Sequence, residues 1–432
     1  MSTEAPQQIK LPPLRFSRKR NWASDQAIGF LMEQSVGNSN VISLAAGLVD
    51  QQSLPVEETR NALNELLSDD CLARKMLQYG TTAGYEMLRD QILVLLANLE
   101  GCAVDQLGIG RDQVVVTTGS QQFLSLVGEV LLDPGDICLV AAPTYFVFLS
   151  VLAGLGATAI TIETDSDGMR TDALETQLQQ LETDGLLDRV KLIYAVSYYE
   201  NPSGISLSEE RRPELVEIAR RWSKTNRILI LEDAAYRELR YDGPQLPSVW
   251  SFDADCESVI LTQTFSKSFS PGLRVGYGIV PRDLIDPIFD RKSNDDFGSA
   301  NFNQHLIASV MQSGLYESHV EFVRDSYRKK RDCMLQAADR YFTGLDGVTW
   351  VHPHGGLYVW MSLPETIETG FSSELFKTAT QTEQVMYVPG ELFYTDDSCR
   401  LRNQMRLSFG VQTLEGINEG MKRLANAVAS IL

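Results

Sequence analysis

The sequence predicts an α/β fold with a mainly parallel, seven-stranded sheet, helices on both of its faces, and a second, smaller α+β domain. Two observations support this prediction. Between about residues 50 and 310, short apolar runs alternate with helical stretches, which is the rhythm of βαβ units. Several of these runs are continuously apolar, as is typical of strands buried on both faces of a parallel sheet.

The elements can be placed in chain order. A polar N-terminal arm leads into a polar helix over about residues 23–35 and a short apolar strand at 41–44. Helical stretches at 123–132 and 213–222 supply the βαβ crossovers. The seven strands of the sheet are expected at residues 114–117, 137–141, 157–162, 191–196, 228–232, 259–262 and 275–280.

After about residue 315 the pattern changes. A long charged helix over 318–341 precedes a terminal helix and short strands, which are expected at 348–351, 358–361 and 405–409. This is an α+β pattern. We therefore predict a large domain over residues 46–315 and a small domain formed by residues 1–45 and 316–432, with the N-terminal arm packed on the small domain.

Composition limits the classes of function. The 432 residues carry 44% hydrophobic and 22% charged side chains, as expected of a globular protein with a large core. A net charge of −19 argues against nucleic acid or an anionic membrane surface as partner, and no apolar run approaches the roughly 20 residues of a membrane span. The six cysteines form no CxxC pair, and the N-terminus has no apolar signal core, so we expect reduced cysteines, a cytoplasmic location and no metal site.

The first motif is a glycine turn between a strand and a helix. Gly119, Ser120 and Gln121 directly follow the strand at 114–117 and precede an apolar helix. Free N–H groups and the positive end of the helix dipole meet at such a turn, and together they favour a phosphate group. A serine that simply caps the helix beside a turn glycine explains the same residues without a ligand.

The second motif surrounds Lys267, near the end of a predicted buried strand. Hydroxyl groups precede it at Thr264 and Ser266, and Arg274 follows seven residues later. Desolvation and a nearby cation both disfavour a charged ammonium group, and the neutral amine can attack a carbonyl carbon. A lysine in an ordinary surface loop is the alternative.

Four more polar residues follow or lie on predicted strands. Asp233 and Tyr236 follow the strand at 228–232, Asn201 lies in an Asn-Pro-Ser-Gly turn after the strand at 191–196, and Tyr145 follows the strand at 137–141. Each has an ordinary structural explanation: a capping aspartate, a plain turn or a core tyrosine. Their convergence at the carboxyl ends of one parallel sheet, where such sheets bind ligands, favours a shared site instead.

Taken in order, these segments resemble a known family. The motifs GSQQ, PTY, NPSG, DAAY, SKSFSPGLRVG and RLSFG, with QYG at 78–80 and VPG at 388–390, are similar to the class I/II aminotransferases of fold type I, which depend on pyridoxal 5'-phosphate (PLP). The resemblance is closest to the branch of aminoadipate and kynurenine aminotransferases. It spans nearly the whole chain from about Val41 and implies an aspartate-aminotransferase-like fold with PLP bound to the large domain.

The resemblance implies roles on the ring side of the cofactor. Lys267 would form the internal aldimine and later move the proton between substrate and cofactor. Asp233 would pair with the pyridine nitrogen, Asn201 and Tyr236 would hydrogen-bond the phenolic oxygen, and Tyr145 would stack on the ring.

It also implies a phosphate site and a substrate site. Tyr79 would reach the phosphate from a second subunit, which makes a homodimer expected. Arg406 would bind the substrate carboxylate with both arms of its guanidinium group. The residues expected to hold the phosphate within one subunit are Ser120, Gln121, Thr264, Ser266 and Arg274.

The substrate side departs from the family pattern. Residues 44–49 read LAAGLV where the family often has Phe-Ala-Gly-Gly, so Gly47 is expected to line the substrate site with an altered neighbourhood. Arg20 lies in an N-terminal segment that resembles the arm of aminoadipate-type members, where an arginine binds a distal carboxylate. A solvated basic arm is the alternative for Arg20.

The expected function is therefore the exchange of an amino group between an L-amino acid and a 2-oxo acid by a ping-pong mechanism, with 2-oxoglutarate and glutamate as one pair. A PLP-dependent β-eliminating lyase or decarboxylase on the same fold is the alternative. A transcription regulator with an aminotransferase-like domain is disfavoured, because about 40 residues precede the core and the net charge is −19.

Overall fold

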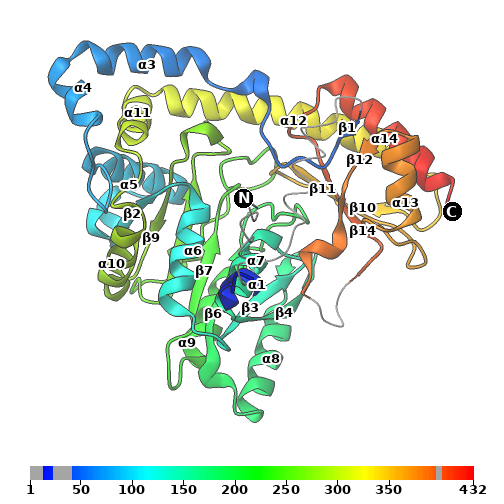
Figure 1. Cartoon of the computed structure of the whole chain (residues 1–432), viewed down its shortest axis with the longest axis horizontal. Coiled ribbons are helices and arrows are strands. Elements are labelled where there is room, and N and C mark those ends of the chain that lie inside the picture. The colour runs from blue at the N-terminus through cyan, green and yellow to red at the C-terminus, as the bar shows by residue number, and fades with distance from the viewer. Residues whose placement is uncertain (1–12, 23–40, 396–400) are drawn as a thin grey trace, which may run out of the picture.

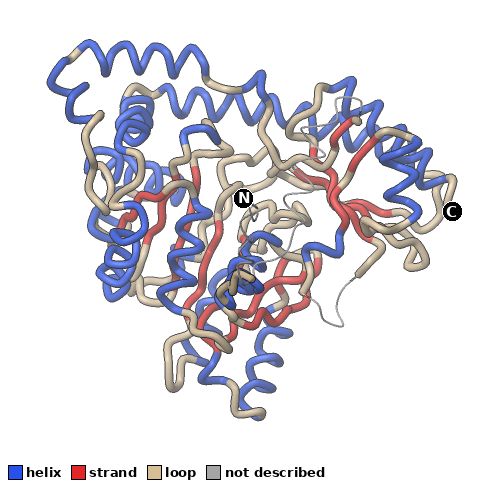
Figure 2. The backbone as a smooth tube through the Cα atoms, in the orientation of Figure 1, coloured by secondary structure: helices blue, strands red, loops and turns tan. Residues whose placement is uncertain are grey.

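The computed structural model describes residues 13–22, 41–395 and 401–432, so the helix expected over 23–35 lies outside the described residues. The described chain forms one large sheet flanked by helices and one smaller four-stranded sheet beside it (Figure 1). In Figure 2 the strands of the large sheet run through the middle of the molecule, and those of the smaller sheet lie to their right. The predicted α/β fold is confirmed.

The large sheet contains all seven predicted strands. Its order is β2-β9-β8-β7-β6-β3-β4-β5, in which β8, β7, β6, β3 and β4 are parallel to one another and β9 is antiparallel to both β2 and β8. The eighth strand, β5, is a two-residue extension that pairs with the end of β4 through a tight turn. The bounds are β2 (Val114–Thr117), β3 (Ile137–Ala142), β4 (Thr158–Asp165), β5 (Gly168–Met169), β6 (Val190–Val196), β7 (Leu229–Asp233), β8 (Val259–Thr264) and β9 (Gly276–Ile279).

Both faces of this sheet are buried, as the continuous apolar runs predicted. Along β6, Leu192 and Tyr194 belong to one hydrophobic core, and Ile193 between them belongs to the other. Because successive side chains of a strand point to opposite faces, this alternation requires a core on each side. The central strands are therefore held by packing on both faces, and side chains at their carboxyl ends have well-defined positions.

Helices cover both faces of the large sheet. Several of these helices connect strands of the sheet, as the βαβ pattern predicts. The helices α3, α4 and α5 precede the first strand of the sheet, and the pattern does not predict them. The bounds are α3 (Val56–Ser68), α4 (Asp70–Met76), α5 (Glu86–Glu100), α6 (Ser120–Leu131), α7 (Phe146–Leu155), α8 (Thr171–Thr183), α9 (Arg211–Trp222), α10 (Ile285–Asp296) and α11 (Asn301–Gln312). Within the described residues, no helix is both long enough and apolar enough to cross a membrane.

The smaller sheet has the order β10-β11-β14-β13 and is antiparallel throughout. The predicted long charged helix is α12, which packs against the terminal helix α14. The bounds are α12 (Leu315–Phe342), β10 (Thr349–Trp350), β11 (Tyr358–Ser362), α13 (Glu374–Lys377), β12 (Val385–Met386), β13 (Val388–Pro389), β14 (Gln404–Ser408) and α14 (Leu414–Ala429).

The N-terminal segments lie in two places. The strand β1 (Ile42–Ser43) pairs in parallel with β12, next to the smaller sheet. The short helix α1 (Arg18–Trp22) instead packs on α7 of the large sheet, where the Trp22 ring closely faces Gly156. After β1 the chain runs between the two sheets, and Ser408 of β14 donates a backbone hydrogen bond of 2.6 Å to Leu44.

Candidate active site

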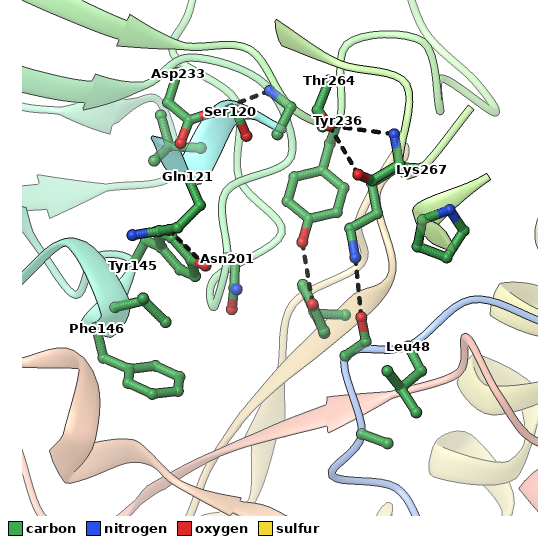
Figure 3. A pocket seen from close by; sticks show the side chains of 18 of the residues that line it. Leu48, Ser120, Gln121, Tyr145, Phe146, Asn201, Asp233, Tyr236, Thr264 and Lys267 are labelled. Carbon is green, nitrogen blue, oxygen red and sulfur yellow. Dashed lines mark hydrogen bonds between the residues drawn. The ribbon is translucent and has the colours of Figure 1, made fainter. Parts of the chain in front are cut away.

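A cavity of about 370 Å³ lies where the carboxyl ends of the large sheet face the smaller sheet. The crevice outside the carboxyl ends of the strands is where α/β folds bind their ligands. Of the fourteen residues predicted to form the site, twelve line this one cavity, and their side chains come from both sheets and the segment between them (Figure 3). They are Gly47, Ser120, Gln121, Tyr145, Asn201, Asp233, Tyr236, Thr264, Ser266, Lys267, Arg274 and Arg406.

Lys267 follows β8 and points across the cavity toward the segment that carries Leu48 (Figure 3). Its Nζ donates a hydrogen bond of 3.0 Å to the Gly47 carbonyl oxygen. Two other buried lysines pair with carboxylates, Lys292 with an aspartate at 2.8 Å and Lys330 with another at 2.7 Å. Among the described residues, no carboxylate pairs with Lys267. Burial lowers the pKa of Lys267, and the charges of Arg406 and Arg274 lower it further, although the neighbouring Tyr358 opposes the shift. A larger share of Lys267 is therefore the neutral amine.

Asp233 ends β7 and is buried, with 4% of its surface exposed. The Tyr194 hydroxyl donates to one carboxylate oxygen at 2.9 Å, and the Ala235 N–H donates to the other at 3.1 Å. Burial raises the pKa of Asp233 to about 6, although both hydrogen bonds oppose that shift. A buried carboxylate held by two donors but by no cation within the described chain is suited to a positively charged ligand.

The amino end of α6 opens into the cavity. Gly119 precedes it with a φ of 74°, and no side chain caps the helix. A Cβ atom at Gly119 would lie 2.7 Å from an Arg274 nitrogen, and one at Gly276 would lie 2.6 Å from the Ser120 nitrogen. The two glycines therefore let Arg274 and β9 approach the turn before α6. Backbone N–H groups and the Arg274 guanidinium group then surround a single site that can bind an anion.

Two hydroxyl groups from the end of β8 complete this side of the cavity. The Thr264 hydroxyl donates to the Ser266 hydroxyl at 2.9 Å, and the Ser266 hydroxyl also accepts a hydrogen bond of 3.4 Å from Arg274. Both hydroxyl groups are largely buried. A phosphate group at the amino end of α6 could accept hydrogen bonds from the two hydroxyl groups, from Arg274 and from the backbone N–H groups of the helix.

Arg406 reaches the opposite side of the cavity from β14. Its Nη1 donates to the Asn201 amide oxygen at 2.8 Å, and its Nη2 donates to the Ala45 carbonyl oxygen at 2.7 Å. The Nε is buried and has no hydrogen-bond partner within the described chain. Because an unpaired buried donor costs free energy, a ligand carboxylate would stabilise this arrangement.

Two tyrosines that the motifs did not single out contact predicted residues. Tyr358 of β11 lies with its hydroxyl 3.1 Å from that of Tyr236, and the Arg406 guanidinium carbon lies 4.3 Å from the centre of the Tyr358 ring. Tyr194 holds Asp233. Strand pairing could have located both, since β11 is hydrogen-bonded to the strand of Arg406 and β6 to the strand of Asp233.

Two predicted residues lie away from the cavity. Tyr79 has 88% of its surface exposed. Arg20 is exposed on α1, with its guanidinium carbon 5.0 Å from the centre of the Phe16 ring. Within the single described chain, neither side chain contributes to the cavity lining.

The fold and the cavity together define a class of enzyme. A lysine without an anionic partner, an anion site at a helix terminus and a buried carboxylate at the end of a central strand fit the amine, phosphate and ring nitrogen contacts of a PLP enzyme. The unpaired Arg406 Nε and the cation-free Asp233 give independent support for this fit.

Comparison with known proteins narrows the class. The chain belongs to the aminotransferase class I and II family, which matches residues 39–424. It is 34% identical to aromatic-amino-acid aminotransferase 1 of Thermococcus litoralis, over 98% of this chain and 97% of that one. It is 32% identical to 2-aminoadipate transaminase of Thermus thermophilus, over 91% of each chain.

A solved structure agrees with these relatives. The Pyrococcus horikoshii kynurenine aminotransferase, in complex with PMP, is 34% identical and superposes with a TM-score of 0.87 over 96% of this chain and 97% of that one. The protein is therefore an aminotransferase close to the aminoadipate and kynurenine branch, and PLP is its cofactor. The predicted family, function and cofactor are confirmed, and a lyase or decarboxylase is not favoured.

Proposed function

We propose that Lys267 binds the aldehyde carbon of PLP covalently and moves the proton during transfer of the amino group from an L-amino acid to a 2-oxo acid, with 2-oxoglutarate and glutamate as one pair. The main support is the geometry of Lys267, whose amine lies in a cavity shared with Asp233 and Arg406 and has no carboxylate partner within the described chain. A lysine kept partly neutral can act both as nucleophile and as base.

The large sheet supplies the groups that hold PLP. When bound, the cofactor ring takes up the electrons of the bond broken at the substrate α-carbon. Asp233 keeps the ring nitrogen protonated, and Tyr145 covers a face of the ring. Asn201 has its amide oxygen occupied by Arg406, so its amide nitrogen remains free to donate to the phenolic oxygen together with Tyr236.

The phosphate is held at the start of α6. Backbone N–H groups at the helix terminus and the side chains around them act together, because each donor compensates part of the negative charge. Within one subunit these residues are Ser120, Gln121, Thr264, Ser266 and Arg274.

The other side of the cavity selects the substrate. Arg406 binds the α-carboxylate, and its bonds to Asn201 and to the segment next to Gly47 fix the direction from which the amino acid enters. Leu48, Phe146 and Val147 form an apolar part of the wall. This wall suits an apolar or aromatic side chain. Two relatives are named for amino acids with such side chains, the aromatic-amino-acid aminotransferase and the kynurenine aminotransferase.

Arg20 is proposed to bind the distal carboxylate of an acidic substrate. The cations that line the cavity within the described chain are Lys267, Arg274 and Arg406, and each already has a role. Arg20 lies on α1, which packs on α7, and it is not part of the cavity lining, so we propose that the arm moves toward the cavity when an acidic substrate binds. The arm would then supply the charge that the apolar wall lacks.

A homodimer is proposed from an exposed apolar patch, defined by Leu77, Tyr79 and Phe297, which are 69%, 88% and 78% exposed. Hydrogen bonds join the two segments that carry it, since the Thr82 hydroxyl donates to the Phe297 carbonyl oxygen at 2.7 Å. Exposed apolar surface of this kind favours a subunit contact. Tyr79 would then reach the phosphate of the neighbouring subunit, and a monomer measured by light scattering would contradict this arrangement.

Residues 46–315 are proposed to act as the large domain, and residues 1–45 with 316–432 as the small one. The helix α1 is an exception within this division, because it packs on α7 of the large sheet and not on the small domain as the sequence predicts. A cytoplasmic location is also proposed, because the five cysteines within the described residues are all free. The hydrogen bonds that Arg406 and Lys267 donate to the carbonyl oxygens of Ala45 and Gly47 support a domain junction at the cavity.

The purified enzyme provides the decisive test. Its visible cofactor absorption should fall when an amino acid is added without an acceptor and return when 2-oxoglutarate follows. Release of ammonia or carbon dioxide without any 2-oxo acid would instead indicate a lyase or a decarboxylase. A protein that shows no visible band after loading with PLP would contradict the proposed role of Lys267.

A further inference from the structure

Tyr358 introduces a hydroxyl group from the smaller sheet into the part of the cavity that otherwise belongs to the large sheet. Its hydroxyl oxygen lies 3.1 Å from that of Tyr236, and the two rings meet edge to face with centres 5.8 Å apart. Both hydroxyl groups are buried. A Cβ atom at Gly47 would lie 2.8 Å from the Tyr358 oxygen, so glycine at that position makes room for the hydroxyl.

The charges around the pair determine which hydroxyl donates. The Arg406 guanidinium group lies over the Tyr358 ring, with its central carbon 4.3 Å from the ring centre. Burial disfavours a phenolate, but the positive charges of Arg406 and Lys267, together with the hydrogen bond shared with Tyr236, outweigh it and lower the pKa of Tyr358. Burial raises the pKa of Tyr236, and the neighbouring Tyr358 adds to this rise. Tyr358 is thus the more acidic hydroxyl and the better donor.

We propose that Tyr358 is a positioning residue whose hydroxyl donates to Tyr236 and thereby directs the Tyr236 proton toward the phenolic oxygen of PLP. The inference rests on the proposed function, in which Tyr236 donates to that oxygen. A hydroxyl that accepts one hydrogen bond becomes a stronger donor in the next, so the pair acts as a chain of two bonds. The chain stabilises negative charge on the phenolic oxygen and lowers the pH at which the linked Lys267 nitrogen loses its proton.

The ring and the hydroxyl of Tyr358 have separable effects. The ring covers the Arg406 guanidinium group and contributes a cation–π contact, which phenylalanine would retain. Tyr358→Phe therefore keeps the ring and removes the hydroxyl group together with its hydrogen bond to Tyr236. The observable is the midpoint pH of the visible cofactor band in the absence of substrate, which packing of the ring does not set.

The experiment is a double-mutant cycle on the PLP-loaded enzyme. Tyr358→Phe should raise the midpoint by roughly 0.2–0.7 pH units, and Tyr236→Phe should raise it by about 1–2 pH units. In the Tyr236→Phe background, the additional Tyr358→Phe change should have no further effect, because the group through which it acts is gone. Tyr387→Phe is the matched control: it removes a buried hydroxyl that donates to the Thr369 carbonyl oxygen at 2.9 Å, away from the cavity lining, and should leave the midpoint unchanged.

Two outcomes would overturn the inference while the proposed function stands: an unchanged midpoint in Tyr358→Phe, or the same shift with and without the Tyr236 hydroxyl. The second result would mean that Tyr358 acts on the cofactor independently of Tyr236. If the wild-type enzyme shows no visible band that titrates with pH, the proposed covalent role of Lys267 fails and the role of Tyr358 fails with it.

Discussion

The two sides of the cavity are built differently. On the cofactor side, Asp233, Lys267 and the start of α6 all belong to one buried sheet or to turns that directly follow its strands. On the substrate side, residues 45–48, the start of α7 and β14 come from separate segments joined by a few hydrogen bonds across the cavity.

This difference means that the cofactor side determines the reaction, whereas the substrate side determines which amino acid is preferred. Groups on a rigid sheet keep the fixed distances that bond breaking requires. Groups on joined segments can shift when the segments move, so side-chain selection can change without disturbing the cofactor contacts. We therefore expect substitutions on the cofactor side to alter the cofactor spectrum, and those on the substrate side to alter the binding of amino acids or the preference among them while the cofactor spectrum stays the same.

The largest effect is expected for Lys267→Arg. Arginine keeps the positive charge but does not lose a proton in the physiological range, so it can act neither as nucleophile nor as base. Transamination should fall by roughly 10⁴-fold. The visible band of the linked cofactor should disappear while PLP still binds, measured by absorbance and by equilibrium dialysis. Activity within tenfold of the wild type would contradict the role of Lys267.

Asp233→Asn tests whether the cofactor side is built around a charge that only the ligand compensates. The single amide oxygen of asparagine can still accept the hydrogen bond of Tyr194 or that of Ala235, which reach different oxygens of Asp233, but the side chain offers no charge to the ring nitrogen. PLP affinity should fall by about 10²–10³-fold, the cost of removing one partner of a buried ion pair. Unchanged affinity in equilibrium dialysis would argue that Asp233 does not face the ring nitrogen.

The same substitution should stabilise the cofactor-free protein. The pKa of Asp233 is raised from 3.8 to about 6 on folding, so the folded state binds this proton more tightly, and that contribution is lost as the pH rises through about 6. At pH 8 the cofactor-free Asp233→Asn variant should therefore unfold with a free energy higher by on the order of 2 kcal/mol. Denaturant titrations should show the difference shrinking as the pH falls from about 8 toward 4.

Arg406→Lys should affect the substrate side alone. A lysine cannot reproduce the bonds to Asn201 and Ala45 while binding a carboxylate with two parallel donors. We expect kcat/KM to fall about 10²-fold for every amino acid donor, with little change in PLP affinity. A loss of cofactor affinity as large as that of Asp233→Asn would show that the two sides are coupled.

The same contrast explains what the sequence could predict. Strand-end residues such as Asp233 and Asn201 were recognisable because a buried strand has a clear apolar pattern and a polar residue after it stands out. Tyr358 and Tyr194 lie within strands, where a tyrosine is most simply interpreted as a core residue. Only the pairing register places the Tyr358 hydroxyl in the cavity and the Tyr194 hydroxyl against Asp233. The two-residue β5 was too short to have any pattern.

The location of Arg20 shows a second limit. Its sequence context predicts a substrate contact, but α1 packs on α7 through Trp22 and Gly156, a long-range contact that no local pattern encodes. The positive charge of the N-terminal arm indicates which ligands the arm could bind, but it does not indicate where the arm packs. The position of such a segment is decided by weak packing, which a ligand can change.

The smallest and most informative effect is expected for the apolar wall. Leu48→Ala removes part of the surface against which a large donor side chain would pack, so kcat/KM for phenylalanine should fall about tenfold while that for alanine stays nearly the same. Arg20→Ala is the matched variant, since it should lower kcat/KM for glutamate and leave phenylalanine unaffected if the arm supplies the distal cation. The kcat/KM values of both variants can be measured from the rate at which each amino acid changes the visible absorption of the cofactor. If Leu48→Ala lowered all donors equally, Leu48 would be holding the Gly47 carbonyl that Lys267 contacts, and the division between the two sides would fail at that residue.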